Sequence, residues 1–527
     1  MQTKKPLVLV ILDGWGEWDN VIGNAVAQAK LPTIDKLNLY YPKIRLQASG
    51  VAAGLPWKEV GNSEVGHQTL GSGQVICQLL PTIDASILDG DFFKKELIIQ
   101  AIEKSKRDNS SIHLMGLLSD GGVHSHIDHL LALISSFGEK GIKNVFVHAI
   151  TDGRDTSPKS AKTYLKKLDD ALKENNVGQI ATLAGRYFTM DRNDNWDRIE
   201  KAYAAMVEGK GIKETDPFNA VDNQYKKDVT DEYLLPVNIT DVSGNPIGLI
   251  KENDTVICFN FRKDRSRQIT RAFVDENFSE FKEVQPIKNV NYICFTEYEE
   301  GLSSNILFPQ AKITTCFGEI ISQKNLNQLR IAETEKYAHV TYFFNGGKED
   351  PFPGEDRILV PSKKNASYAE IPEMSAQEVT DKLLEAIEKE IYDFILVNYA
   401  NSDMVGHTGV LKAGIKAVEF VDQCLDKLIK EVLQRDGQLI VTADHGNIEE
   451  MINLQTGEID TKHSINPVPC WLVTANNHRA TPLKEAPDPE ICGLLSDIAP
   501  TLLHILEIEK PEQMSGESLL DLLQHKN

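Results

Sequence analysis

The stretch Leu7-Val8-Leu9-Val10-Ile11-Leu12 decides the fold expected for this chain, and it ends directly at Asp13-Gly14. An unbroken apolar run of this length is typical of a parallel strand that is buried on both faces. Two similar runs lie far along the chain, each shortly before acidic or imidazole side chains: Phe394-Ile395-Leu396-Val397 before Asp403, and Leu439-Ile440-Val441 before Asp444 and His445. Because the carboxyl ends of parallel strands meet at one sheet edge, we expect these polar residues to lie together there.

Helical patterns separate the late strands. Apolar side chains recur every three or four positions from Ser375 to Glu390 and from Lys412 to Gln434, which is the spacing of an amphipathic helix. Strands that alternate with helices predict an α/β fold with a mostly parallel, covered sheet. Since both chain ends supply strands to this sheet, everything between them must loop out and return.

The middle of the chain repeats this pattern with different residues at the strand exits. Four more apolar runs appear: Ile112–Met115, Val145–Ile150, Ile180–Leu183 and Val256–Phe259. Arginines rather than metal ligands follow them, which predicts a second α/β unit that binds anions. At 527 residues the chain also exceeds the roughly 250–300 residues that one core supports. We therefore predict one domain made of residues 1–77 and 312–527, and an inserted domain of residues 78–311.

Composition narrows the class of protein. With 25% charged residues and a formal net charge of −21, the chain is expected to repel nucleic acid and anionic membranes. Its seven cysteines are odd in number, widely spaced and without a CxxC pair, which favours reduced thiols. The first apolar run is far shorter than a membrane span, and no small-residue cleavage site follows it. A cytoplasmic enzyme is the prediction.

Carboxylate and imidazole donors gather at the exits of the predicted strands. Asp403 and His407 lie four residues apart, and the nearby Gly406 and Gly409 favour a tight loop over a helix. This pair alone is more typical of a solvated loop than of a metal site, but further donors follow the neighbouring strands. The full set is Asp13, Asp403, His407, Asp444, His445 and His463. Such oxygen and nitrogen ligands suit a pair of divalent cations.

A serine joins this set near the start of the chain. Ser63 lies in the segment Gly61–His67, with glycines on both sides. Asn62-Ser63 is a typical helix cap, and a helix N-terminus also offers free N–H groups to a phosphate, so the capping and nucleophile interpretations are compatible. The Gly-x-Ser-x-Gly pattern of a hydrolase triad is not present in this segment.

The middle unit offers a different set of side chains. Its candidate anion ligands are Arg154, Arg186, Arg192, Arg262 and Arg265. A single arginine is usually solvated, but several at corresponding strand exits match phosphate and carboxylate groups. His124 and Asp155 are the acid/base candidates, whereas Asp152 is interpreted as a turn residue. Lys336 lies where the insertion rejoins the chain ends, and an exposed lysine without a role is its alternative interpretation.

The motifs resemble one known family over nearly the whole chain, from about residue 6 to residue 520. In chain order they are Asp13-Gly14, Gly61–His67, Leu118–Asp128, His148–Asp155, Gly185–Arg192, Asn260–Arg265, Glu333–His339, Asp403–His407, Asp444–Gly446 and His463. They resemble the cofactor-independent phosphoglycerate mutases, which belong to the alkaline phosphatase superfamily. The resemblance implies an alkaline-phosphatase-like domain built from both chain ends, with an inserted phosphotransferase domain that binds the substrate.

The resemblance also implies ligands and roles. It implies two manganese ions, one held by Asp403, His407 and His463, and the other held by Asp13, Ser63, Asp444 and His445. It implies that 3- or 2-phosphoglycerate is held by His124, Arg154, Asp155, Arg186, Arg192, Arg262 and Arg265, with Lys336 reaching in from the other domain. It further implies a monomer that works without bisphosphoglycerate, and the net charge of −21 predicts that neither nucleic acid nor membrane is a partner.

The reaction expected from these residues is phosphoryl transfer. Ser63 would take the phosphoryl group of 3-phosphoglycerate while two cations neutralise its oxygens, and glycerate would then reorient and take it back on its other hydroxyl. Asp155, helped by His124, would exchange the protons, and Lys336 would complete the catalytic set. The alternatives are a metal-dependent phosphatase, a sulfatase or a phosphopentomutase with the same metal domain, and a non-catalytic anion- or metal-binding protein.

Overall fold

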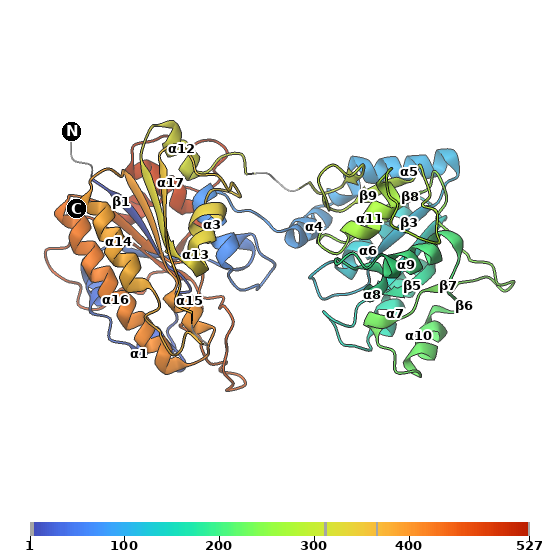
Figure 1. Cartoon of the computed structure of the whole chain (residues 1–527), viewed down its shortest axis with the longest axis horizontal. Helices are drawn as coiled ribbons and strands as arrows, with labels where there is room; N and C mark the ends of the chain where they lie inside the picture. The colour runs from blue at the N-terminus through green and yellow to red at the C-terminus, as the bar shows by residue number, and fades with distance from the viewer. Residues whose placement is uncertain (1–4, 310–312, 365–366, 525–527) are drawn as a thin grey trace. The chain divides into compact units, whose positions relative to one another are not determined.

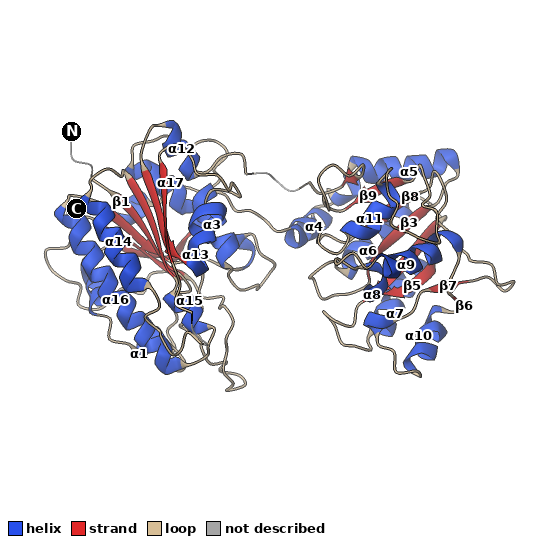
Figure 2. Cartoon of the chain, in the orientation of Figure 1, coloured by secondary structure: helices blue, strands red, loops and turns tan. Residues whose placement is uncertain are grey.

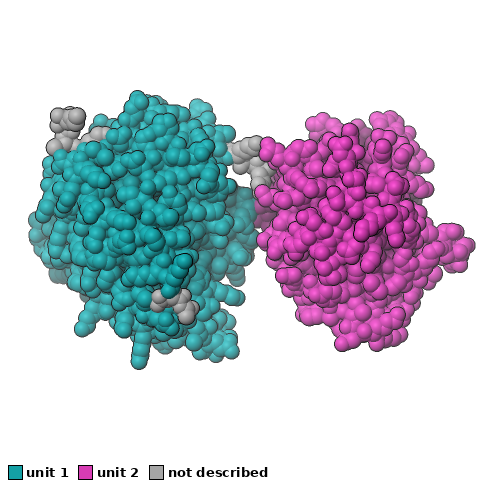
Figure 3. Space-filling model, viewed as in Figure 1, with its two compact units in different colours: residues 1–78, 311–527 teal, residues 79–310 magenta. Residues whose placement is uncertain are grey.

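The computed structural model describes residues 5–309, 313–364 and 367–524. The chain folds into two compact units, of which unit 1 is Met1–Gln78 with Ala311–Asn527 and unit 2 is Leu79–Gln310 (Figure 3). The first predicted boundary, after Cys77, lies one residue from this division. The second predicted boundary, near Lys312, lies outside the described residues.

Unit 1 contains a sheet in which the first strand of the chain lies among its late strands (Figures 1 and 2). The strand order is β12-β11-β13-β1-β14-β15-β2-β16. The strands are β1 (Leu7–Leu12), β2 (Lys43–Gln47), β11 (Gln328–Glu333), β12 (Glu355–Val360), β13 (Phe394–Tyr399), β14 (Gln438–Thr442), β15 (Val468–Val473) and β16 (Ile491–Leu494). Strand β1 pairs in parallel with both β13 and β14. The predicted α/β fold with strands from both chain ends is confirmed.

Strand β15 is the exception to the parallel arrangement. It pairs antiparallel with β14 on one side and with β2 on the other. The segment that leads into an antiparallel strand starts at the edge where its parallel neighbours end. This reversal explains how a loop that precedes β15 reaches the same sheet edge as the loops that follow β1, β13 and β14.

Helices cover both faces of this sheet, and the apolar side chains between the layers form one continuous core. Figure 1 shows α14 (Ala376–Glu388) and α16 (Leu411–Gln434) on one side of the sheet and α3 (Ser63–Ser72) on the other. The remaining helices of unit 1 are α1 (Ala25–Gln28), α2 (Pro32–Tyr40), η1 (Gly50–Ala53), α12 (Phe317–Gln323), α13 (Thr334–Ala338), the π-helix η4 (His339–Phe343), α15 (Asn401–Gly406), η5 (Leu495–Asp497), α17 (Ile498–Ile505) and α18 (Leu520–Leu523).

Unit 2 contains a second sheet, of order β10-β9-β8-β3-β4-β5-β7-β6. Its strands are β3 (Ile112–Leu117), β4 (Val145–Thr151), β5 (Gln179–Gly185), β6 (Ile212–Glu214), β7 (Val237–Ile239), β8 (Thr255–Cys258), β9 (Asn291–Cys294) and β10 (Asn305–Ile306). The four predicted runs form its central strands β8, β3, β4 and β5, which are parallel to one another. Only β7 pairs antiparallel, with β5, among the strands described.

Helices also cover the second sheet. They are α4 (Leu79–Leu88), η2 (Phe92–Lys94), α5 (Glu96–Asp108), α6 (Ile127–Glu139), α7 (Ala161–Glu174), α8 (Arg186–Thr189), α9 (Trp196–Glu208), α10 (Pro217–Tyr225), η3 (Asp231–Tyr233) and α11 (Arg267–Val274). Separate apolar clusters pack within this unit. Among the described helices of either unit, none combines the length and apolarity needed to cross a bilayer.

Candidate functional site

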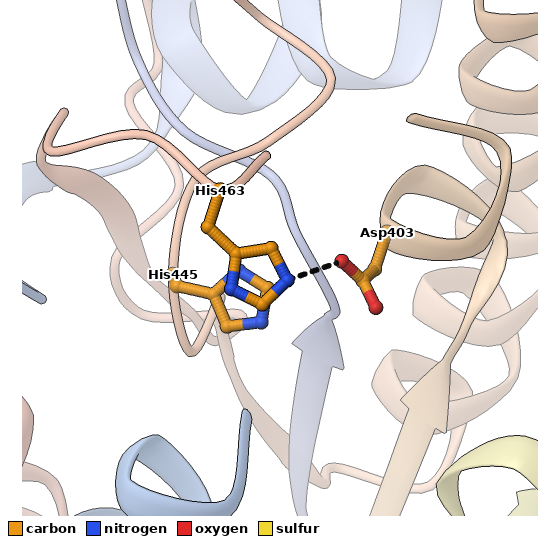
Figure 4. A group of neighbouring side chains, drawn as sticks. All are labelled: Asp403, His445 and His463. Atoms are coloured by element: carbon orange, nitrogen blue, oxygen red, sulfur yellow. Dashed lines mark ion pairs between the residues drawn. The ribbon is translucent and has the colours of Figure 1, made fainter. Parts of the chain in front are cut away.

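The predicted metal ligands of unit 1 meet at the edge where its parallel strands end. Asp13 follows β1, Asp403 lies in α15 just after β13, and Asp444 and His445 follow β14, while His463 precedes β15. Ligand atoms of Asp403, His445 and His463 converge within 4.8 Å of one another (Figure 4), and so do those of Asp13, His67 and Asp444. The strand topology therefore explains why these distant residues form one cluster.

Two imidazoles face the carboxylate of Asp403 through their Nε2 atoms. His463 Nδ1 lies 2.7 Å from the carbonyl oxygen of Gly61, and His407 Nδ1 lies 2.6 Å from that of Thr461. A carbonyl oxygen only accepts, so in the neutral imidazoles each Nδ1 carries the hydrogen and each Nε2 a lone pair. The two Nε2 atoms lie 3.0 Å apart, and each lies 3.1 Å from Asp403 Oδ1. Three electron-rich atoms that converge in this way fit a divalent cation.

Electrostatics at the same edge also fit cations. Asp13, Asp403 and Asp444 are buried together, and burial followed by the nearby Asp444 carboxylate raises the pKa of Asp13. Burial opposes ionisation of Asp444, but the neighbouring His445 and His67 outweigh it and lower its pKa. Several carboxylates out of water repel one another unless positive charge lies between them.

Lys336 supplies one such charge. Its side chain is only 3% exposed, and its Nζ lies 2.5 Å from Asp13 Oδ1 and 2.7 Å from Asp403 Oδ2. Burial disfavours the ammonium, but the two carboxylates outweigh that effect and raise the pKa of Lys336. The Nζ also donates to Ser63 Oγ at 2.9 Å. The interpretation of Lys336 as an exposed lysine is wrong, because the side chain is buried.

Ser63 is the first residue of α3 and is 7% exposed. The capping role belongs to its neighbour, because Asn62 Oδ1 accepts a hydrogen bond from the backbone N–H of Val65. This leaves Ser63 Oγ facing Lys336 and His445, whose Nε2 lies 2.7 Å away. Gly66 lets α3 approach the sheet, since a Cβ there would lie 2.9 Å from the carbonyl oxygen of Asp444.

The segment from Asp403 to His407 corrects one expectation. The glycines favoured a tight loop, but Asp403 lies in the short helix α15 and His407 is its C-cap. Gly406 serves close packing instead, because a Cβ at this position would collide with the side chain of Asn447. Because residues four apart share one face of a helix, the side chains of Asp403 and His407 lie on the same side of α15.

Two residues near the cluster were given no role from the sequence. His67 Nδ1 lies 2.9 Å from the carbonyl oxygen of Ser63 and 3.2 Å from Asp444 Oδ2, while its Nε2 lies 3.0 Å from Asn398 Nδ2. The other hydrogen of this amide goes to Asp13 Oδ2 at 2.7 Å. Both ring nitrogens of His67 therefore have partners, and the ring holds Asp444 directly and Asp13 through Asn398. The sequence feature that could have indicated this contact is the polar Asn398, which lies in an otherwise apolar strand.

The predicted anion ligands of unit 2 lie at the carboxyl ends of its central strands. His124 follows β3, Arg154 and Asp155 follow β4, Arg186 and Arg192 follow β5, and Arg262 and Arg265 follow β8. Burial, and then the positive charges of Arg186, Arg192 and Arg154, lower the pKa of Arg265. Guanidinium groups gathered at these strand ends form a concentrated positive site within the unit, which suits an anion.

Three aspartates pair with arginines of this set. Asp264 Oδ2 accepts from Arg192 at 3.0 Å, and its Oδ1 lies 3.2 Å from Arg262 Nε. Buried Asp152 accepts from Arg186 Nη1 at 2.7 Å, and the same Nη1 donates to Asp155 Oδ2 at 2.6 Å. Asp152 was interpreted only as a turn residue, and Asp264 was not singled out.

His124 is almost fully enclosed, at 4% exposure. Burial, and then the charge of Arg186, lower the pKa of His124 to about 4. The imidazole is therefore neutral near pH 7 and is able to donate from one nitrogen and accept at the other. The Oδ1 atom of Asp264 lies 3.7 Å from His124 Nδ1.

Comparisons with known proteins agree on one relationship. Residues 83–300 match the family model described as the N-terminus of BPG-independent PGAM, and residues 329–466 match that of type I phosphodiesterase / nucleotide pyrophosphatase. The chain is 50% identical over 517 residues to the 2,3-bisphosphoglycerate-independent phosphoglycerate mutase of Clostridium novyi, covering 98% of this chain and 99% of that protein.

Two further relatives extend this result. The protein of the same name from Clostridioides difficile is 48% identical over 518 residues, with 98% of this chain and 99% of that protein covered. A crystal structure of Leishmania mexicana phosphoglycerate mutase at low cobalt concentration is similar over 98% of this chain and 97% of that one, with a TM-score of 0.59 and 32% identity.

Proposed function

The chain belongs to the family of 2,3-bisphosphoglycerate-independent phosphoglycerate mutases, and on that premise we propose how its residues interconvert 3-phosphoglycerate and 2-phosphoglycerate. Unit 1 is the metal-binding, phosphatase-like domain in this proposal, and unit 2 is the inserted domain that binds the glycerate part of the substrate. The observation that carries it is the contact of Ser63 Oγ with both Lys336 Nζ and His445 Nε2 at a carboxylate-rich sheet edge.

Ser63 is the residue that accepts the phosphoryl group. Its hydroxyl proton leaves to solvent before the transfer, as the cations would favour when bound. The Oγ then bonds to phosphorus as the bond from phosphorus to the glycerate oxygen breaks, which leaves a phosphoserine and a glycerate oxygen that takes up a proton. The Lys336 ammonium donates to this Oγ at 2.9 Å and stabilises the negative charge that develops on it. The low exposure of Ser63 limits the access of water, which would otherwise release phosphate.

Two divalent cations complete the site of unit 1. One would be held by Asp403, His407 and His463, and the other by Asp13, Ser63, Asp444 and His445. When bound, such ions neutralise charge on the phosphoryl oxygens. We assign manganese as the physiological ion, supported by the mixed carboxylate and imidazole ligands, which suit borderline metals.

The arginines of unit 2 bind the glycerate. Arg154, Arg186, Arg192, Arg262 and Arg265 supply planar guanidinium groups for its carboxylate and for the phosphoryl group. Asp155 gives a proton to the glycerate oxygen that the phosphoryl group leaves and then takes one from the hydroxyl that receives the phosphoryl group, and neutral His124 passes protons at the same position. Glycerate therefore has to turn over in place, because the phosphoryl group returns to the adjacent oxygen.

The test is interconversion of the two phosphoglycerates without added bisphosphoglycerate, followed by phosphorus NMR. We expect Ser63→Ala and chelation of metal each to abolish it, while Ser72→Ala, at the other end of the same helix, leaves it near the wild-type rate. Peptide mapping after acid quenching should find phosphate on Ser63. Release of free phosphate with no isomer formed would instead identify a phosphatase.

A second measurement tests retention of glycerate. With labelled free glycerate in solution, we expect no label in the product phosphoglycerate during the first turnovers. Incorporation of label would contradict the proposal that glycerate stays bound and turns over in place.

We further propose that the chain works as a monomer in the cytoplasm on this small-molecule substrate. The net charge of −21 disfavours nucleic acid and anionic membranes as partners. The seven cysteines, all within the described residues, are free thiols, as expected for a reducing compartment.

A further inference from the structure

We infer that Glu449 is a positioning residue that holds three ligand-bearing loops of unit 1 in register and thereby sets the metal affinity of the site. This inference rests on the proposed metal site, but Glu449 itself touches none of the proposed ligand atoms. It is 0% exposed, and it follows β14 by a few residues.

The contacts of Glu449 come from three separate segments. Its Oε2 accepts from the backbone N–H of Gly16, in the loop after Asp13, and from that of Asn447, in the loop after Asp444 and His445, both at 2.9 Å. Its Oε1 accepts from Ser464 Oγ, and from Asn466 Nδ2 at 3.0 Å. Ser464 is the residue after His463, so one carboxylate joins the loops of four proposed ligands.

The surrounding backbone leaves room for this carboxylate. A Cβ on Gly16 or on Gly446 would collide with Glu449 Oε1, so glycines from two loops form the cradle. Ser464 adds a backbone link on each side, since its N–H donates to Gly446 O at 2.9 Å and its carbonyl oxygen accepts from Gly61 N at 3.3 Å. The second link reaches the segment that carries Ser63.

The chemistry of the four donors explains why glutamate suits this position. All four are neutral, and among the described residues no cation pairs with Glu449, so its negative charge adds to the potential that attracts metal ions. A glutamine of the same shape replaces one acceptor oxygen with an NH₂ group, which faces N–H donors and weakens at least one link. Ligands held less rigidly must be ordered when the metal binds, at a cost to affinity.

The experiment is a calorimetric titration of the metal-free full chain with Mn²⁺. We expect Glu449→Gln to weaken binding about 10- to 100-fold, as loss of an outer contact typically does, and Glu449→Ala to weaken it further. Glu450→Gln is the matched control, because Glu450 also accepts from Asn466 Nδ2, at 3.1 Å, but contacts no loop backbone. The affinity of the Glu450→Gln variant for Mn²⁺ should stay within about twofold of that of the wild type.

Two further measurements distinguish a loss of metal affinity from a loss of folding or of mutase function. Thermal unfolding of the metal-free variants should match that of the metal-free wild type, and if Glu449→Gln does not fold, Ser464→Ala carries the test with a smaller loss of affinity. Unchanged affinity in the folded variants would overturn the inference. If the wild type shows mutase activity without binding Mn²⁺, the proposed metal site fails and this inference with it, whereas the family assignment stands.

Discussion

At the scale of single residues, Asp152 has more influence than its place in a turn suggests. Its Oδ1 accepts from the backbone N–H groups of Arg154 and Asp155 at 3.1 and 3.0 Å, and its Oδ2 accepts from Ser119 Oγ at 2.6 Å. Burial opposes ionisation, but the hydrogen bonds from Ser119, Asp155 and Arg186 outweigh it and lower the pKa of Asp152. The carboxylate therefore stays charged and fixes two proposed substrate ligands.

We predict that Asp152→Asn lowers kcat/KM by about 10- to 100-fold, equivalent to roughly 1.4–2.8 kcal/mol. Arg186 Nη1 and the two backbone N–H groups all donate to Oδ1, whereas Ser119 donates to Oδ2. The amide loses the negative charge that holds Arg186 even when its NH₂ group takes the place of Oδ2, and it clashes with three donors when the NH₂ group takes the place of Oδ1, so Arg186 and Asp155 are held less firmly. Steady-state kinetics in both reaction directions measure the effect. Asp222→Asn, which removes a partner of Lys162 on the surface, is the control and should leave kcat/KM unchanged, and an equal loss in both variants would contradict the prediction.

The location of some residues of the cluster could be predicted from the sequence, whereas that of others could not. Asp13, Asp403 and Asp444 were predictable because each comes directly after, or shortly after, an apolar strand whose end fixes its location. Asp264 and His67 were not, because their roles depend on partners brought in from distant segments. His445 shows the same limit, because the sequence does not determine which cation it would bind. Its Nε2 lies 3.7 Å from Asp13 Oδ1, but its ligand atom also lies close to those of Asp403 and His463.

At the scale of elements, helix α3 sets where Ser63 lies. It packs closely on the backbone after β14 at Gly66, where a Cβ would lie 2.9 Å from Asp444 O and 3.0 Å from Asp444 Cβ. These neighbours belong to a buried loop that contains proposed ligands, so they have little freedom to move.

We predict that Gly66→Ala lowers kcat by about tenfold or more, because α3 has to move away from Asp444 and takes Ser63 with it. Helix propensity alone favours alanine by about 1 kcal/mol, so a loss of activity would reflect the close approach. Gln68→Ala, on the same helix and only partly buried, should retain activity. Higher activity or unchanged kinetics in Gly66→Ala would show that the contact relaxes freely.

Element types were predicted more reliably than their pairing. The runs at residues 7–12, 394–397 and 439–441 became β1, β13 and β14, because buried parallel strands leave a strong apolar signal. The antiparallel direction of β15 had no such signal. Direction is set by the connection and by the neighbouring strands, and this reversal is what brings His463 to the site.

At the scale of the whole molecule, the proposed cations should stabilise unit 1 alone. A metal at 100 times its Kd adds about 2.7 kcal/mol to the stability of the state that binds it. We predict that Mn²⁺ slows amide hydrogen exchange in residues 401–407 and 444–464 and leaves β3 to β5 of unit 2 unchanged. A chelator should reverse the protection and remove mutase activity together. Full activity after exhaustive chelation would contradict this prediction.

Unit 2 should respond to acid through a chain of buried histidines. His113 Nδ1 lies 3.0 Å from His148 Nε2, His148 Nδ1 lies 2.9 Å from Thr182 Oγ1, and His113 Nε2 lies 3.2 Å from Asp254 Oδ2. Burial lowers the pKa of His113, and burial followed by His113 lowers that of His148. Both imidazoles are therefore neutral in the folded unit at neutral pH.

A histidine whose pKa is lowered by folding binds its proton more readily when unfolded, so acid favours unfolding. The free energy of unfolding that these histidines contribute is fully present above the unfolded pKa of about 6.5 and is lost as pH falls below it. We predict weaker amide protection of β3 and β4 at pH 5 than at pH 7.5, after correction for intrinsic exchange. The exposed His504 gives a control, since His504→Gln should not change this difference. Equal protection at the two pH values would contradict the prediction.

The position of β1 at the start of the chain has a consequence for synthesis. Its two neighbours are β13 and β14, and the backbone of Gly14 bonds to a side chain 430 residues later. On the ribosome, the first strand therefore emerges long before its partners exist, whereas every strand of unit 2 lies within one continuous stretch. Unit 2 is complete first, and the uncharged segment Leu7–Leu12 must be shielded from other chains while it waits.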